Sequence, residues 1–217
     1  TSKMNSIESE ILSNNLNYTL FEWRKQSGYK PLNINKAEGV YLIDHQKNKI
    51  LDFSSGLINV NIGHGDQRVT DAVVNQMKKV SYVNPSTITK VRGDLGKKLS
   101  EICPGNLNKS FFTICGATGI ENAIKLARIY TGRHKILTRY RSYHGSTMGA
   151  MSAGGDPRKL KVDNQMGTNF VHLEIPYEYR STGQEWKQDC FDQLDRILAY
   201  EGPENFAAII MEGESGS

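Results

Sequence analysis

The fold is decided by residues 111–132, FFTICGATGIENAIKLARIYTG, in which a short apolar run passes through a glycine-rich junction into a helical pattern. The first five residues are typical of a buried strand. Apolar residues then recur at 120, 123, 124 and 127, the spacing of one inward-facing helix side, and Gly132 follows where a helix would end. The stretch predicts a strand at 111–115 that turns into a helix at CGATG, residues 115–119.

The same alternation continues on both sides of this stretch. Upstream, Asp66 caps a predicted helix that runs to Val80, and a second helix around Leu95 is stopped by Pro104-Gly105. Downstream, the spacing predicts strands at 135–140, 168–174 and 206–211 and a helix at 190–200 whose inward residues are Phe191, Leu194, Ile197 and Leu198. Strands separated by helices of this length indicate β-α crossovers. We expect an α/β fold with a mostly parallel sheet and helices on both faces.

The first 60 residues follow a different pattern. A helical opening is predicted through Trp23, followed by GVYLIDHQKNKILDF at 39–53, which reads as a hairpin with its turn at Gln46-Lys47-Asn48. This change predicts two structural units, residues 1–60 and residues 61–217.

The composition excludes several classes of function. The 217 residues carry 38% hydrophobic and 23% charged residues, and the net charge of +4 has no basic run behind it, which disfavours nucleic acid as a partner. No apolar run approaches the roughly 18 residues of a membrane span, and the polar N-terminus is unlike a signal peptide. Three widely spaced cysteines argue against a disulfide framework and against a zinc site. We expect a cytoplasmic protein without a metal.

The CGATG junction lies where an open α/β sheet binds its ligands, beyond the carboxyl end of a strand. A helix that starts near Thr118 presents unpaired N–H groups and the positive end of its dipole, and Gly116 permits close backbone approach. The junction matches neither the dinucleotide-binding nor the P-loop pattern. From the residues alone it is either a phosphate cradle or a plain β-α turn.

A second cluster, YRSYHGST at 140–147, follows the next predicted strand. Tyr143 could lie on a flat ring, and His144 could supply a hydrogen bond. Alternatively, Tyr143 packs on the rim of the sheet and His144 is a loop histidine with its own partners. Because both clusters follow neighbouring strands, a ring with a phosphate tail would fit between them.

Four segments in order resemble the class III aminotransferases, which are pyridoxal-phosphate-dependent enzymes of fold type I. They are DFSSGLINVNIGHGDQRV at 52–69, GATGIENAIKLARIYTGRHKI at 116–136, RYRSYHGSTMGAMSAGGDPR at 139–158 and FAAIIMEGESGS at 206–217. The resemblance covers most of residues 39–217. The stretches RYRSYHG and EGESGS are most similar to those of taurine–pyruvate and ω-amino acid aminotransferases.

The resemblance implies roles for particular residues. Those that would bind pyridoxal 5'-phosphate are Gly116, Ala117 and Thr118 at the phosphate, Tyr143 stacked on the ring, His144 and Gly145 completing its triplet, and Glu212 near the cofactor. Those that would shape the substrate pocket are Leu57, Ile58 and Trp23. The sequence departs from the family pattern where Ala117 replaces a frequent serine, Ile58 a common tryptophan and Gly213 the usual proline, which bears on the substrate class more than on the fold.

The implied reaction moves an amino group from an amine or ω-amino acid to a 2-oxo acid such as pyruvate. In the family, the lysine that forms a Schiff base with the cofactor and the aspartate that pairs with the pyridine nitrogen lie after the Glu212 segment, and therefore beyond Ser217. We expect this chain to be a truncated N-terminal part, inactive alone, of a homodimeric enzyme. Residues 1–60 would contribute to the small domain and the active-site entrance, and residues 61–217 would form the first part of the large domain.

Two other readings stay open at this stage. One is a non-catalytic protein that keeps the phosphate site for binding or assembly. The other is a different enzyme that uses the same cofactor on the same scaffold, such as an aminomutase or a decarboxylase.

Overall fold

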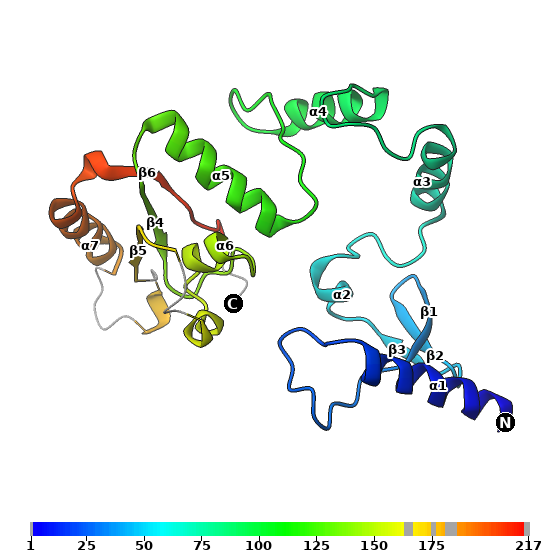
Figure 1. Cartoon of the computed structure of the whole chain (residues 1–217). Helices are drawn as coiled ribbons and strands as arrows, with labels where there is room; N and C mark the ends of the chain where they lie inside the picture. The colour runs from blue at the N-terminus through cyan, green and yellow to red at the C-terminus, as the bar shows by residue number, and fades with distance from the viewer. Residues whose placement is uncertain (1, 163–166, 175–176, 181–185, 215–217) are drawn as a thin grey trace. The chain divides into compact units, whose positions relative to one another are not determined.

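The computed structural model describes residues 2–162, 167–174, 177–180 and 186–214 (Figure 1). The chain divides into two compact units, Thr1–Ile88 and Thr89–Ser217. The predicted boundary at residue 60 lies inside the first unit, and the assignment of the units to a small and a large domain stays a prediction.

The first unit contains a small antiparallel sheet. Its elements are α1 (Ser2–Tyr18), β1 (Ile34–Glu38), β2 (Tyr41–Asp44), β3 (Lys49–Leu51), α2 (Ser55–Ile58) and α3 (Gln67–Lys79). The strands lie in the order β1-β2-β3, so the predicted hairpin is confirmed, with Lys47 at a positive φ of 68° in its turn. The sequence did not reveal β1. The predicted opening helix is too long, because α1 ends at Tyr18 and Trp23 lies in a turn beyond it.

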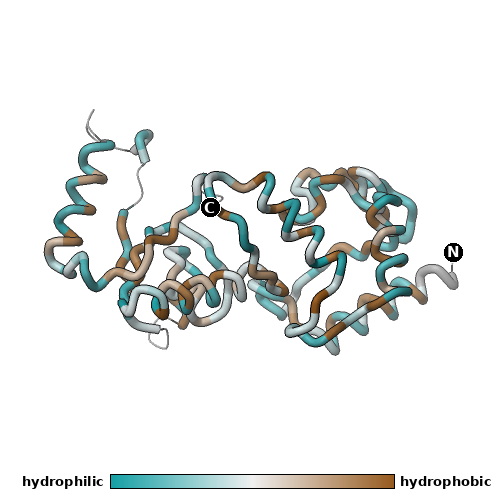
Figure 2. The backbone as a smooth tube through the Cα atoms, turned by 90° about the horizontal axis from the view of Figure 1, so that it is seen from above, coloured by the Kyte–Doolittle hydropathy of each residue, from teal (hydrophilic) through white to brown (hydrophobic). Residues whose placement is uncertain are grey.

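The two helices predicted before residue 104 are present. Asp66 caps α3 by accepting a hydrogen bond from the amide of Arg68 at 2.9 Å. In the second unit, α4 spans Lys90–Ile102 and is followed by Pro104. No residue of either helix is buried, although both carry an apolar side. Figure 2 shows hydrophobic and hydrophilic residues interspersed along the helical turns of the chain, as expected for helices with one apolar side.

The predicted strand at 111–115 is wrong. The structure assigns no strand there, and Ile114 is 95% exposed. A strand needs a neighbour to receive its hydrogen bonds, and none of the described strands pairs with this run. Local apolarity was therefore not enough to form a strand.

The second unit is built on a parallel sheet, as predicted. Its strands are β4 (Lys135–Arg139), β5 (Phe170–Leu173) and β6 (Phe206–Ile209), in the order β5-β4-β6. Its other elements are α5 (Gly116–Thr131), α6 (Met148–Ala153), α7 (Trp186–Glu201) and the 3-10 turns η1 (Pro157–Lys161), η3 (Glu178–Arg180) and η4 (Pro203–Asn205). In the central strand, Leu137 lies opposite Val171 on one side and Ile209 on the other. Helix α5 ends at Gly132, which adopts a left-handed φ of 68°.

Helices cover both faces of this sheet, because alternate residues of β4 point to opposite sides (Figure 1). Ile136 is fully buried with Ile124 of α5 and Ala153 of α6. Leu137 is fully buried on the other face, where Leu194, Ile197 and Leu198 of α7 pack. Burying a side chain of this size contributes roughly 1.5–3 kcal/mol. Two expected inward residues do not reach the core, since Ala123 and Phe191 are exposed.

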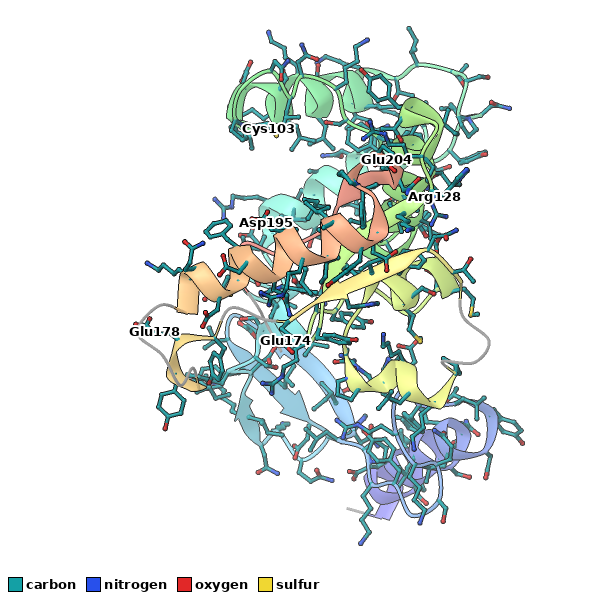
Figure 3. The ribbon with its side chains drawn as sticks, turned by 90° about the vertical axis from the view of Figure 1, so that its left-hand side faces the viewer. Cys103, Arg128, Glu174, Glu178, Asp195 and Glu204 are labelled. Carbon is teal, nitrogen blue, oxygen red and sulfur yellow. The ribbon has the colours of Figure 1, made fainter. Side chains whose placement is uncertain are left out.

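Arg128, labelled in Figure 3, fixes the C-terminal end of α5 to the sheet. Its Nε donates to the carbonyl of His134 at 2.9 Å, and its guanidinium lies 5.4 Å from the ring centroid of Phe170 on β5. The other end of α5 is thereby held at the carboxyl edge of the sheet. None of the helices that the structure describes combines the length and the apolarity needed to cross a membrane.

Candidate functional site

An ion pair joins the carboxyl ends of β4 and β6. Arg139, the last residue of β4, donates from Nε at 3.0 Å and from Nη2 at 2.8 Å to the same oxygen, Oε2, of Glu212. The side chains are 11% and 23% exposed, respectively. A cation this deeply buried needs a partner, and Glu212 supplies it. Sequence reasoning found Glu212 and missed Arg139. The signal was an arginine at the carboxyl end of a strand, next to the YRSYHGST cluster.

Glu212 also holds the backbone of the loop that follows β4. Its Oε1 accepts a hydrogen bond from the amide of Tyr143 at 3.1 Å. Burial raises the pKa of the Glu212 carboxyl, but the hydrogen bonds from Arg139 and from backbone amides outweigh burial, so the pKa lies below its ordinary value. Glu212 is therefore an anion that fixes the position of Tyr143.

His144 carries a buried ring nitrogen without a partner. Its Nε2 has no hydrogen bond in the part of the chain that the structure describes. Burial lowers the pKa of the imidazole; nearby Glu212 opposes this shift and Arg139 adds to it. The ring is therefore neutral at pH 7, and a buried polar atom of this kind calls for a ligand or a further contact.

The 143–145 triplet meets the start of α5 at Gly145. This glycine has a positive φ of 132°, and a Cβ placed on it would lie 2.5 Å from the Cβ and 2.7 Å from the Cα of Ala117. Only glycine fits at such a distance. The structure thus brings together the two clusters that the sequence placed after separate predicted strands.

The first turn of α5 is open on one side. A Cβ placed on Gly116 would meet no atom within 4 Å, and the first amides of a helix have no partner inside it. The hydroxyl of Thr118 lies 3.2 Å from Sγ of Cys115, which precedes the helix. Hydrogen bonds from this hydroxyl and from the amides of Thr118 and Ala117 lower the pKa of the Cys115 thiol, while burial raises it slightly. The turn stabilises negative charge.

A second carboxylate, which sequence reasoning missed, connects α5 to α6. Oε1 of Glu121 accepts from the hydroxyl of Thr147 at 2.6 Å and from the amides of Gly149 at 2.8 Å and Ala150 at 3.2 Å. Burial raises the pKa of Glu121, but these hydrogen bonds outweigh it and the pKa is lowered. The residue fixes the segment after the triplet against the helix that starts at Gly116.

A guanidinium lies over the ring of Tyr143. The Cζ of Arg158 is 4.3 Å from the ring centroid, within the range of a cation–π interaction. Arg158 is held by Asp156, with Nε 2.6 Å from Oδ1 and Nη2 2.8 Å from Oδ2. Sequence reasoning missed this pair. One face of the Tyr143 ring is therefore covered by a cation.

The remaining candidate residues lie in the first unit. Trp23 is in an exposed turn after α1, and Leu57 and Ile58 form part of α2 with their side chains largely exposed. The candidate residues that the structure brings together all belong to the second unit, at 116–118, 143–145 and 212.

Comparison with known proteins identifies the family. The class-III aminotransferase family matches residues 24–217. The chain belongs to this family. It is 32% identical over 212 residues to the putrescine–pyruvate aminotransferase of Pseudomonas aeruginosa, covering 87% of this chain and 45% of that protein. It is 34% identical over 166 residues to the isoleucine 2-epimerase of Lentilactobacillus buchneri, covering 74% of this chain and 36% of that protein.

Among solved structures, the chain is similar to the taurine:2-oxoglutarate aminotransferase of Bifidobacterium kashiwanohense, which was determined in complex with PLP and glutamate. The TM-score is 0.89 at 36% identity, over 94% of this chain and 48% of that one. The resemblance to class III aminotransferases and the fold type I architecture are thereby confirmed. The chain spans less than half the length of these relatives.

Proposed function

We propose that the protein containing this chain is a pyridoxal-phosphate-dependent aminotransferase that moves the amino group of an amine or ω-amino acid to a 2-oxo acid such as pyruvate. The observation that carries the proposal is the contact between Gly145 and Ala117, which places an aromatic-His-Gly triplet beside an open helix N-terminus. The match to the class III family over residues 24–217 supports it.

The first turn of α5 fits the phosphate of the cofactor. Gly116, Ala117 and Thr118 would hold it, because the helix dipole favours an anion, the amides of Ala117 and Thr118 point to the side where Cys115 lies, and the space beside Gly116 is open. The lowered pKa of the Cys115 thiol has the same origin, since the Thr118 hydroxyl and the amides of Thr118 and Ala117 favour negative charge there. The alternative, a plain β-α turn that binds no ligand, has less support.

The triplet fits the ring of the cofactor. The face of Tyr143 opposite Arg158 would stack on the pyridine, and the unpartnered Nε2 of His144 would find a polar partner. Glu212, held by Arg139, fixes the backbone amide of Tyr143. The residue that would stack on the cofactor is therefore in place before the cofactor binds. When bound, pyridoxal phosphate supplies an electron sink for negative charge at the carbon that carries the amine.

The proposal also covers the residues that would contact the substrate, the cellular compartment, the oligomeric state and the domains. Trp23, Leu57 and Ile58 would line the path of the donor, which could be taurine, β-alanine, 4-aminobutyrate or a diamine. We further infer a cytoplasmic homodimer, in which residues 1–60 belong to the small domain and residues 61–217 to the large one. The names of the two similar aminotransferases, one for putrescine and one for taurine, support a donor whose amine is not on a carbon that carries a carboxylate.

An absorbance spectrum of the whole protein tests the proposal. Purified with pyridoxal phosphate, it should show a band at roughly 410–430 nm that fades when a suitable amine is added, because the cofactor takes up the amino group. Tyr143→Phe should keep the band, and Tyr143→Ala should weaken cofactor binding. A folded protein with no band at saturating cofactor would refute the proposal.

A second candidate is another reaction of the same cofactor, such as epimerisation, aminomutation or decarboxylation. The similarity to an isoleucine 2-epimerase favours keeping it. Only amino transfer consumes a 2-oxo acid, so product formation that does not depend on pyruvate would support the second candidate.

A further inference from the structure

The chain that enters the turn η1, which carries Arg158, is bonded to the backbone just before Tyr143. The amide of Gly155 donates to the carbonyl of Ser142 at 2.9 Å and to its hydroxyl at 3.1 Å. The carbonyl of Gly155 accepts from the amide of Arg141 at 2.9 Å, and Ser142 is fully buried. Only glycine fits at 155, because a Cβ there would lie 2.3 Å from a Cα of the chain just after β4. The two segments therefore hold a fixed position relative to each other.

Asp156 fixes the guanidinium of Arg158. As the cap of η1, it accepts from the backbone amide of Arg158 at 2.8 Å. The same carboxylate accepts from Nε at 2.6 Å and from Nη2 at 2.8 Å, which is a bidentate arrangement. These hydrogen bonds lower the pKa of the Asp156 carboxyl and raise the pKa of the guanidinium. Asp156 is thus an anion that balances the charge of Arg158.

The same pairing at the start of α3 shows what capping alone does to an arginine. Asp66 accepts from the amide of Arg68 at 2.9 Å, from its Nε at 3.1 Å and from its Nη2 at 2.6 Å. The side chain of Arg68 is 88% exposed, whereas that of Arg158 is 39% exposed. Capping leaves the guanidinium in solvent, so it does not account for the packing of Arg158 on the Tyr143 ring, 4.3 Å from the ring centroid.

The hydrogen bond to the Tyr143 amide does not set the direction of the ring. Glu212 fixes this amide, but a tyrosine side chain still rotates about two bonds, and the second rotation is broad. Tyr143 is 44% exposed, so its surroundings cover only part of it. The guanidinium of Arg158 contacts the ring face itself, and a planar guanidinium packs well on an aromatic face.

We propose that Arg158 is a positioning residue, whose guanidinium supports one face of the Tyr143 ring so that the other face is ready to stack on the pyridine of the cofactor. The stacking part rests on the proposed function, and the support of the ring does not. Asp156 balances the charge, so Arg158 acts through the position of its planar group more than through a net field.

Fluorine NMR of the whole protein without cofactor tests the support of the ring. With 3-fluorotyrosine incorporated at position 143, the fluorine signal reports the surroundings and the motion of this one ring. Arg158→Met, which keeps a long side chain but removes the planar cation, should shift the signal and change its width, because the ring then samples several orientations. Arg68→Met, the matched control, breaks the same kind of capping pair and should leave the signal unchanged. An identical signal in the wild type and Arg158→Met would overturn the proposal.

Binding of pyridoxamine 5'-phosphate tests the positioning role. This form of the cofactor has no aldehyde, so calorimetry reports the contacts of its ring and phosphate without a covalent bond. Arg158→Met should raise the Kd about fivefold, within the range of partly exposed cation–π contacts. Arg158→Lys should recover only part of this loss, because lysine keeps the charge and lacks the planar group. Arg68→Met should leave the Kd unchanged.

The Tyr143→Leu background separates an action through the ring from a general loss of structure. In that background, Arg158→Met should change the Kd by less than about twofold, because no ring is left to support. A change that is still about fivefold would overturn the positioning role. Full recovery by Arg158→Lys would also overturn it, since the effect would then belong to the charge.

The outcomes keep the two proposals apart. An unchanged Kd in Arg158→Met, in a protein whose wild type binds the cofactor, would overturn the positioning role and leave the proposed function in place. A folded wild type that binds neither pyridoxamine 5'-phosphate nor pyridoxal phosphate would overturn the proposed function together with the stacking. The fluorine signal would still decide whether Arg158 supports the ring.

Discussion

Replacing Arg139, and so breaking its ion pair with Glu212, should cost the folded protein about 2–3 kcal/mol. Breaking a buried pair by removing one partner costs about 3–5 kcal/mol, and we reduce this figure because Glu212 is 23% exposed. Arg139→Gln removes two hydrogen bonds, at 3.0 and 2.8 Å, and leaves a carboxylate that still holds the amide of Tyr143. The measurement is urea unfolding of the whole protein at saturating cofactor.

A double-mutant cycle isolates the interaction. Arg139→Gln, Glu212→Gln and the double variant should give a coupling free energy of about 1–2 kcal/mol. The control cycle uses Lys135 and Glu201, a pair at the other end of β4 that is 25% and 40% exposed and should couple by less than about 1 kcal/mol. Additivity of the Arg139 and Glu212 substitutions to within about 0.5 kcal/mol would refute the reasoning.

The pH dependence gives a second check on the same pair. The folded pKa of Glu212 lies below 4.5, so its stabilisation is complete above the unfolded value and is lost as the pH falls through the folded value. The stability difference between wild type and Arg139→Gln should therefore be constant near pH 7 and shrink below 4.5. A difference that grows in acid would contradict the assignment of Glu212 as an anion.

Three further substitutions or modifications probe the site. Gly145→Ala should cost about 2–3 kcal/mol and weaken cofactor binding, because the new methyl overlaps Ala117 at 2.5 Å; Gly132→Ala, with a positive φ but open space, should cost only about 1 kcal/mol by the same urea midpoint. Iodoacetamide should label Cys115 before the other two cysteines, since its pKa is lowered and it is exposed, and bound cofactor should slow the reaction in peptide maps. Ile58 has a left-handed φ of 65° in α2. Ile58→Gly should stabilise the protein by about 0.5–1 kcal/mol, as relief of about 1–2 kcal/mol of left-handed strain exceeds the glycine entropy cost; a lower urea midpoint would contradict the strain.

The elements that the sequence predicted well are those fixed by local spacing. Apolar spacing, with glycine or proline beside the element, was enough to predict the helix that starts at Gly116 and the strands that start at Lys135 and Phe206. The run at 111–115 failed because a strand depends on a partner that its own residues do not specify.

The site was harder to predict, because its key contacts are long-range. Arg139 and Glu212 are 73 residues apart, and Glu121 and Thr147 are 26 apart, so no local pattern links them. A motif could point to Tyr143, but not to the guanidinium that covers its ring. The positive φ angles of Leu57 and Ile58 in α2 run against local preference altogether, since leucine and isoleucine give no sign of positive φ.

The contact between Glu121 and α6 couples the side chains that positions 121 and 149 can accept. A Cβ on Gly149 would lie 2.3 Å from Oε2 of Glu121, so the two side chains compete for one space. A larger residue at 149 would displace the Glu121 carboxylate, and the amides at the start of α6 would then need a new acceptor. The small residue at 149 is therefore what lets one carboxylate of α5 hold the first turn of α6.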